Sequence, residues 1–216
     1  MTFIKSLIHK ILNKEISNIY NKRFDNFNNT PKGVFWNSKL SQDLRLNIIL
    51  DKILQNTKSD EFSIADIGCG YGSFADYLNR NYNESKFNYE GFDINPKFIK
   101  HCRSKFSEAN LRFIIDSKPS SKKDFVTMSG TYNLATTTNV SLWEQYLFSC
   151  LSECWSYTKT AMIFNLQTST KSKISSQNIY YANASKVIDF CVSKLGPTRV
   201  VRDSSLENDA TFTVVR

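Results

Sequence analysis

The sequence has few of the residues on which several common enzyme classes depend. Two histidines, His9 and His101, occur among its 216 residues. It has five cysteines but no Cys-x-x-Cys pair, and it has no Gly-x-Ser-x-Gly nucleophile motif. Cys150 and Cys154 lie four residues apart, without a histidine nearby to complete a zinc site. We therefore predict neither a Ser-His-Asp hydrolase nor a metal centre.

The sequence also lacks long apolar segments. No run reaches the roughly 18 residues that a membrane-spanning helix requires, so we expect no transmembrane segment. The first 20 residues alternate between apolar and polar side chains, unlike a secretory signal. An odd number of irregularly spaced cysteines is typical of reduced thiols, which favours a cytoplasmic protein. With 41% apolar and 22% charged residues, the composition is that of one folded domain with a short appendage.

Basic residues are in excess, and the excess is concentrated at the N-terminus. The chain has 28 Lys+Arg against 20 Asp+Glu, a formal charge of +8. Residues 1–24 hold five basic residues and one acid, Glu15, which gives +4 and half of the total. Apolar residues in this segment recur at helical spacing, at Ile4, Leu7, Ile8, Ile11, Leu12, Ile16 and Ile19.

This N-terminal helix has three interpretations. We favour packing on the domain or on a second copy of the chain, which would make a homodimer. The alternatives are an anionic membrane surface and a nucleic acid. Because the charges after residue 24 are dispersed, a nucleic-acid partner is not favoured.

From residue 62 onward, apolar strand patterns alternate with helical patterns. This order predicts an α/β fold with a doubly wound, mostly parallel sheet of seven strands. The last two strands leave no room for a helix between them, so the last strand should be antiparallel. We predict an N-terminal helical arm and loop over residues 1–40 and one ligand-binding domain over 41–216. Strands are expected at 62–67, 87–92, 111–115, 125–128, 160–166, 198–201 and 211–215, and helices at 41–54, 73–79, 96–106, 142–157 and 184–195.

The most informative motif runs from Asp66 to Ser73, with the sequence Asp-Ile-Gly-Cys-Gly-Tyr-Gly-Ser between a strand and a helix. Glycines in such a turn let a ligand approach the backbone. A dinucleotide motif would have a third glycine where Ser73 stands. The carboxylate of Asp66 suits a ligand with a positive ammonium or sulfonium better than a pyrophosphate. Asp93, at the end of the next strand, can accept both ribose hydroxyls of an adenosine.

These residues resemble the class I S-adenosylmethionine-dependent methyltransferases, which have a Rossmann-like fold. The match runs through Asp66–Gly72 and through Gly91-Phe92-Asp93-Ile94-Asn95-Pro96, and the order of elements agrees over roughly residues 40–216. The resemblance implies S-adenosylmethionine as cofactor. It implies that Asp93 binds the ribose, that Ile94 and Asp116 meet the adenine, and that the methionine part lies along Asp66, Gly68, Cys69, Gly70, Tyr71, Gly72, Ser129 and Gly130.

A second resemblance is to a smaller group of bacterial methyltransferases of mostly unassigned substrate. It involves residues 36–45, 129–133, 164–166 and 209–213. It implies that Trp36, Ser38, Gln42 and Arg45 close over the cofactor, and that Arg45 pairs with its carboxylate. The alternatives are a solvated helix face for Gln42 and Arg45, and core packing for Trp36.

The end of the fourth strand bears on the acceptor. Methyltransferases that act on amides and exocyclic amines usually carry (D/N)PP(Y/F) there, whereas this chain has Ser129-Gly130-Thr131-Tyr132. We therefore expect in-line methyl transfer to a small molecule or sugar, at oxygen. Tyr132, Asn133 and Asn165 are the catalytic candidates, and the loop 167–183 is expected to set specificity.

Two alternatives to a small acceptor stay open. One is an RNA or protein methyltransferase, and the other is a non-catalytic protein that binds a cofactor or partner. The sequence also predicts that deletion of residues 1–24 leaves cofactor binding intact.

Overall fold

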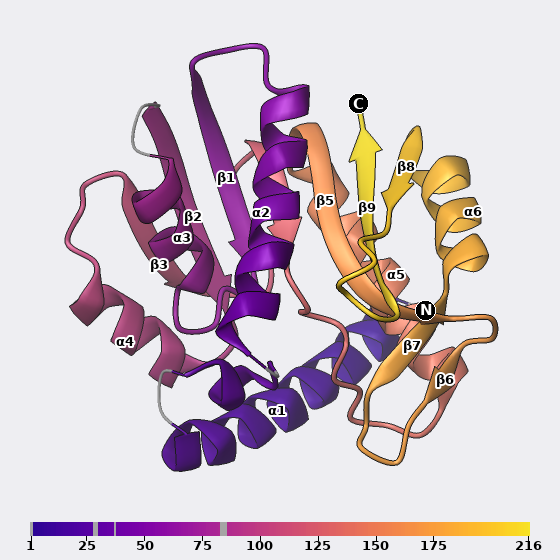
Figure 1. Cartoon of the computed structure of the whole chain (residues 1–216). Helices are drawn as coiled ribbons and strands as arrows, with labels where there is room; N and C mark the ends of the chain where they lie inside the picture. Colours follow the sequence, from indigo (N-terminus) through magenta and orange to yellow (C-terminus); the bar gives the residue numbers. More distant parts are fainter. Residues whose placement is uncertain (1, 28–29, 37, 83–85) are drawn as a thin grey trace.

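The computed structural model describes residues 2–27, 30–36, 38–82 and 86–216. Two helices and a short 3-10 turn precede the sheet, after which strands and helices alternate (Figure 1). The helices are α1 (Thr2–Phe27), α2 (Lys39–Asn56), α3 (Ser73–Asn81), α4 (Pro96–Lys105), α5 (Val140–Ser156) and α6 (Ala184–Lys194), with η1 (Pro31–Val34) between the first two. The strands are β1 (Glu61–Ile67), β2 (Lys86–Asp93), β3 (Leu111–Ile115), β4 (Lys123–Met128), β5 (Thr158–Ser169), β6 (Lys173–Ile174), β7 (Tyr180–Asn183), β8 (Thr198–Val201) and β9 (Asp209–Val215).

Side-chain caps set the starts of four helices, α2, α4, α5 and α6. Asn95, Asn139 and Asn183 each accept a backbone N–H from the first turn of α4, α5 and α6. At α2 the cap is Ser38, whose hydroxyl accepts the Ser41 N–H at 3.1 Å. The helix predicted over 41–54 therefore began two residues later than α2 does. Either serine can cap a helix, and only the backbone conformation distinguishes them.

The sheet confirms the predicted fold class. Strands β3, β2, β1, β4 and β5 are adjacent in that order, and all of their pairings are parallel. Strand β9 pairs antiparallel with β5, and β8 pairs antiparallel with β9. The last strand is therefore reversed, as expected. The carboxyl ends of the five parallel strands meet at one edge of the sheet, where ligands bind in folds of this wiring.

Within the described residues the sheet has nine strands rather than the seven predicted. The two additional strands, β6 and β7, lie in the segment that the sequence predicted as a loop over 167–183. Strand β7 continues the sheet by pairing with the end of β5, Thr168 opposite Ala182. Its buried residues, Tyr180 and Ala182, alternate with partly exposed ones. Because Ser, Thr and Asn residues surround these four, the alternation did not indicate a strand in the sequence.

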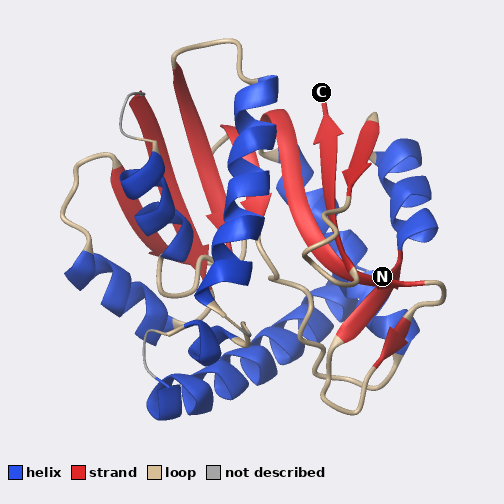
Figure 2. Ribbon diagram, in the orientation of Figure 1, coloured by secondary structure: helices blue, strands red, loops and turns tan. Residues whose placement is uncertain are grey.

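Apolar cores cover both faces of the sheet, with helices on each side (Figure 2). One core joins α2, α3 and α4 to the strands, and the other joins α5 and α6. Helix α1 crosses the edge toward which the β1 arrow points (Figure 1). Its buried residues Leu12 and Ile16 belong to the second core. Among the described residues, no helix combines the length and the apolar character needed to cross a membrane.

Candidate functional site

A cleft opens at the carboxyl ends of the parallel strands. Its walls come from the β1–α3 turn, the end of β2, the segment after β4, and the inner face of α1. The predicted residues that line it are Trp36, Asp66, Gly68, Cys69, Gly70, Tyr71, Asp93, Ile94, Asp116, Ser129, Gly130 and Tyr132.

The glycine turn at the floor of the cleft requires glycine for two reasons. Gly68, Gly70 and Gly72 have φ values of +72°, +55° and +81°, which side chains rarely adopt. A Cβ at Gly68 would also lie 2.6 Å from the Cγ2 of Thr131. The turn is therefore pressed against the segment that follows β4. Gly72 does not border the cleft, because it packs against Phe106.

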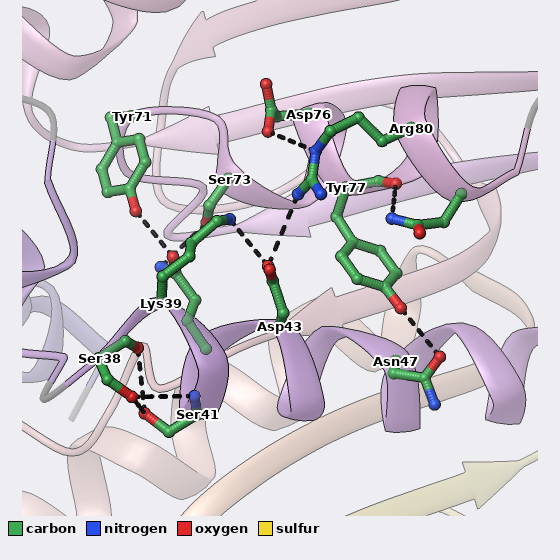
Figure 3. Close-up of polar contacts among 12 residues, drawn as sticks. Ser38, Lys39, Ser41, Asp43, Asn47, Tyr71, Ser73, Asp76, Tyr77 and Arg80 are labelled. Carbon is green, nitrogen blue, oxygen red and sulfur yellow. Dashed lines mark hydrogen bonds and ion pairs between the residues drawn. The ribbon is translucent and has the colours of Figure 1, made fainter.

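Polar contacts join helix α2 to the start of α3 (Figure 3). The Tyr71 hydroxyl donates to the Gln42 side chain at 2.7 Å, and Gln42 donates to the Ser73 hydroxyl at 3.3 Å. Further along, Tyr77 donates to Asn47 at 2.9 Å, as Figure 3 shows. Gln42 is only 1% exposed, so the solvated-face alternative for it is wrong. Gln42 therefore holds the glycine turn through Tyr71 and Ser73, whereas Ser38 caps α2.

Asp93 joins the turn to the end of β2. One carboxylate oxygen accepts the Gly70 N–H at 2.9 Å, and the other accepts the Asn95 N–H at 2.8 Å. The side chain is 8% exposed and borders the cleft. Burial raises the pKa of Asp93 to about 6, although both backbone hydrogen bonds oppose this rise. The carboxyl group is thus ionised near neutral pH and has lone pairs left for a ligand.

Asp66 lies deeper, at the end of β1. Its carboxylate accepts the Tyr89 hydroxyl at 2.7 Å and the Thr127 hydroxyl at 3.1 Å. Burial raises the pKa of Asp66 to about 7, against the effect of those two hydrogen bonds. It therefore adds negative potential to the cleft above that pH.

The raised pKa of Asp66 leads to a prediction about stability. Between about pH 4 and pH 7 the native carboxyl group holds a proton that the unfolded chain has released, so stability falls as the pH rises. The Asp66→Asn variant lacks this dependence. As the pH rises through this window, we expect the unfolding free energy of the variant minus that of the wild type to increase by up to about 1.4 kcal/mol per pH unit. Urea denaturation of both proteins at several pH values measures the difference, and a constant difference would contradict the prediction.

The N-terminal helix closes the cleft, which the sequence did not predict. Asn13, Ile16 and Tyr20 of α1 line it, together with Val34 and Trp36. Asn13 accepts the Tyr146 hydroxyl at 2.6 Å, which ties α1 to α5. Burial and the nearby Asp93 carboxylate raise the pKa of Tyr20 far above its ordinary value, so it stays a neutral phenol. The spacing of 13, 16 and 20 on one helical face was the available signal.

Besides Ser38, Gln42 and Gly72, three predicted site residues do not border the cleft. Asn165 accepts the Gly130 N–H at 2.6 Å, and Asn133 accepts the Gln167 N–H at 3.0 Å. Arg45, which the resemblance assigned to the cofactor carboxylate, pairs with Asp209 at 2.8 Å. It is 9% exposed, so the solvated-face alternative is wrong for it also. Trp36 both lines the cleft and packs on the Arg45 guanidinium, at 4.6 Å.

Tyr132 lines the cleft but is largely buried beside Tyr146 and Cys150. Burial raises its pKa well above the ordinary value. It can therefore donate a hydrogen bond but cannot act as a base near neutral pH. Tyr180, which lies in the segment predicted as a specificity loop, is fully buried and donates to Glu144 at 3.3 Å.

The lining of the cleft is acidic, although the protein is basic. Asp66, Asp93 and Asp116 contribute carboxylates, and no Lys, Arg or His is among the described lining residues. This charge opposes a pyrophosphate and attracts a cation. The Ser129 hydroxyl is buried at the end of β4 without a hydrogen-bond partner in the described part of the chain. A buried polar atom of this kind is usually satisfied, so the wall fits a ligand with polar groups.

Residues 64–160 match the family model described as a methyltransferase domain. The provisionally named methyltransferase Rv1506c of Mycobacterium tuberculosis is 29% identical over 135 residues, which is 62% of this chain and 80% of that protein. These matches indicate a methyltransferase domain over residues 64–160. This agrees with S-adenosylmethionine as the cofactor, which the glycine turn, Asp93 and the acidic lining of the cleft fit.

Solved methyltransferase structures share this fold. Magnesium protoporphyrin IX methyltransferase from Synechocystis PCC 6803, crystallised with S-adenosylmethionine, has a TM-score of 0.61 at 13% identity, over 82% of this chain and 80% of that chain. A Leishmania major S-adenosylmethionine-dependent methyltransferase has a TM-score of 0.66 at 11% identity, over 91% and 82%. At these identities the likeness concerns the fold alone.

Proposed function

We propose that this methyltransferase transfers the methyl group of S-adenosylmethionine to an oxygen of a small-molecule or sugar acceptor. The observation that carries the proposal is the cleft itself, which is bounded by α1 and lined by three carboxylates. A concave site covered by a helix in this way is typical of small ligands rather than of macromolecules. An RNA would have to bring phosphates to a wall that holds three carboxylates and no described basic residue.

We assign the cofactor contacts as follows. The Asp93 carboxylate accepts the ribose hydroxyls, Ile94 and Asp116 border the adenine, and the methionine part lies along the turn from Gly68 to Tyr71 beside Ser129 and Gly130. The two carboxylates of Asp66 and Asp93 stabilise the positive charge of the ligand. The bound cofactor supplies an activated methyl group. The residues of the cleft therefore need mainly to align the acceptor and exclude water.

The basic N-terminal segment gives less support to a nucleic-acid acceptor than its charge suggests. Arg23 is held within the protein, with its guanidinium 3.8 Å from the centre of the Phe35 ring and donating to the Lys32 carbonyl at 2.7 Å. The inner face of α1 presents Asn13, Ile16 and Tyr20 to the cleft rather than lysines. Lys10, Lys14 and Lys22 are exposed on other faces of the helix.

The ionisable groups of the cleft bear on the kind of oxygen that is methylated. An oxygen with a high pKa needs a base to remove its proton. Burial raises the pKa of Tyr132, Tyr146 and Cys150, so these groups hold their protons near neutral pH. Acceptors that ionise without help, such as carboxylic acids and acidic phenols, are therefore expected to react faster than plain alcohols of sugars.

A panel assay tests the proposed function. Purified enzyme with isotopically labelled S-adenosylmethionine is incubated with carboxylic acids, phenols, sugars, amines, bulk RNA and unfolded protein, and methylated products are read by mass spectrometry. Label on an oxygen of a small acceptor supports the proposal. Label only on RNA, on protein or on nitrogen would overturn the assignment of acceptor while leaving the methyltransferase activity in place.

A further inference from the structure

A buried polar network connects the outside of the domain to the cleft wall. It consists of Arg45 in α2, Asn165 and Gln167 in β5, and Asp209 at the start of β9, and we call it the Asp209 network. The Asp209 carboxylate accepts Arg45 Nε at 2.8 Å, Gln167 Nε2 at 3.0 Å and Asn165 Nδ2 at 3.4 Å. Asn165 in turn accepts the Gly130 N–H at 2.6 Å.

Gly130 is the point at which this network meets the cleft. It has a φ of +72° and lines the cleft between Ser129 and Thr131. A Cβ at this position would lie 3.0 Å from Trp36 Cζ2, so the backbone is close to that ring. The Thr131 hydroxyl donates to the Ile67 carbonyl at 2.7 Å, beside the glycine turn. A shift of Gly130 would therefore displace two parts of the cleft wall, Trp36 and Thr131.

Stability alone gives little reason for such a network. Burying an ion pair costs desolvation that its attraction often fails to recover, and apolar residues of similar size would serve a core equally well. Asn165 and Asp209 are 2% and 3% exposed, and neither borders the cleft. What they provide instead is a fixed acceptor for one backbone N–H at the cleft wall.

We propose that Arg45, Asp209 and Asn165 are positioning residues that hold Gly130 in the conformation that cofactor binding requires. Arg45 fixes the Asp209 carboxylate, the carboxylate orients the Asn165 amide, and the amide oxygen fixes the Gly130 N–H. The side chains act through the backbone and do not touch the cofactor. This inference rests on the assignment of the cleft to S-adenosylmethionine.

A reciprocal exchange tests the orientation of the network. In Asn165→Asp, two carboxylates face each other across the 3.4 Å contact, and we expect the affinity for S-adenosylhomocysteine to fall about tenfold or more. Asp209→Asn alone removes the charge that holds Arg45, and we expect a loss of several-fold. The double variant N165D/D209N restores one carboxylate and one amide. Residue 165 then accepts both the Gly130 N–H and the new amide N–H, so we expect affinity within about threefold of the wild type.

Calorimetry with S-adenosylhomocysteine is the main measurement, with hydrogen exchange of the Gly130 amide by NMR as the second. The exchange rate should rise in each single variant and fall again in the double variant. Glu144→Gln is the matched control, because it removes another buried carboxylate, which pairs with the exposed Lys186, and neither residue borders the cleft. It should lower the melting temperature without changing the affinity.

Each outcome decides the proposal. Should Asn165→Asp fail to fold, Asn165→Ala takes its place in the affinity and exchange measurements, and Asp209→Asn still provides a single variant. A double variant that binds no better than the singles, or single variants with wild-type affinity, would overturn the positioning role. Failure of the cleft assignment is distinguishable, because Asp93→Ala would then also bind normally.

Discussion

Replacing Asp93 with alanine is expected to weaken S-adenosylmethionine binding by more than tenfold. The substitution removes the carboxylate that we assign to the ribose hydroxyls, and it leaves the N–H groups of Gly70 and Asn95 without their acceptors. Each buried donor left unpaired costs about 1–3 kcal/mol. The loss of affinity therefore has two causes, the missing contact with the ribose and a less firmly held glycine turn. Calorimetric titration of the variant with S-adenosylmethionine measures it.

Asp116→Ala provides the matched comparison. Asp116 also lines the cleft, but it is exposed and its carboxylate accepts the adjacent Ser117 N–H. Because water can replace such a contact, we expect less than about a threefold change in affinity. Equal effects from the two variants would indicate a general response to lost negative charge. Unchanged affinity in Asp93→Ala would remove the ribose assignment.

Removing residues 1–24 is expected to weaken cofactor binding at least tenfold, contrary to the prediction from the sequence. The deletion takes Asn13, Ile16 and Tyr20 from the wall of the cleft. It also uncovers the apolar surface under Leu12 and Ile16, each of which contributes about 1.5–3 kcal/mol by its burial. Calorimetry on the truncated protein, after circular dichroism has established that it is folded, checks the expectation.

Point substitutions separate closure of the cleft from general packing. The double variant I16A/Y20A shortens two side chains that face the cleft. The double variant L7A/I11A shortens two on the outer face of the same helix, where Leu7 and Ile11 are each 50% exposed. We expect a loss of affinity in the first and none in the second. Equal affinity in the two double variants would mean that the cleft-facing side chains of α1 do not contribute to cofactor binding.

Much of the fold could be predicted because the parallel strands are short apolar segments bounded by turns. The strands at Leu111–Ile115 and Thr198–Val201 have the predicted bounds. The strand β7 could not be predicted in the same way. Its four residues lie among polar ones, and its position depends on pairing with the end of β5 rather than on local pattern.

The site residues also differ in whether a local sequence pattern could indicate them. The glycine turn and Asp93 are close in sequence, and their spacing indicated a nucleotide-like ligand. Arg45 and Asp209 are 164 residues apart, so a pattern in one segment could not show that they form a pair. The resemblance drew attention to both segments but assigned Arg45 to a ligand. The fold shows that a partner for the guanidinium already exists within the protein.

The acidic wall of the cleft has a consequence for turnover. Asp66 and Asp93 attract the sulfonium of the methyl donor, whereas the spent cofactor is a thioether and has lost that positive charge. Each reaction therefore removes the electrostatic part of the attraction from the molecule that must leave. We expect this charge pattern to moderate product inhibition and to favour exchange of used for fresh cofactor. The burial of two carboxylates would then serve the rate of recycling as well as recognition.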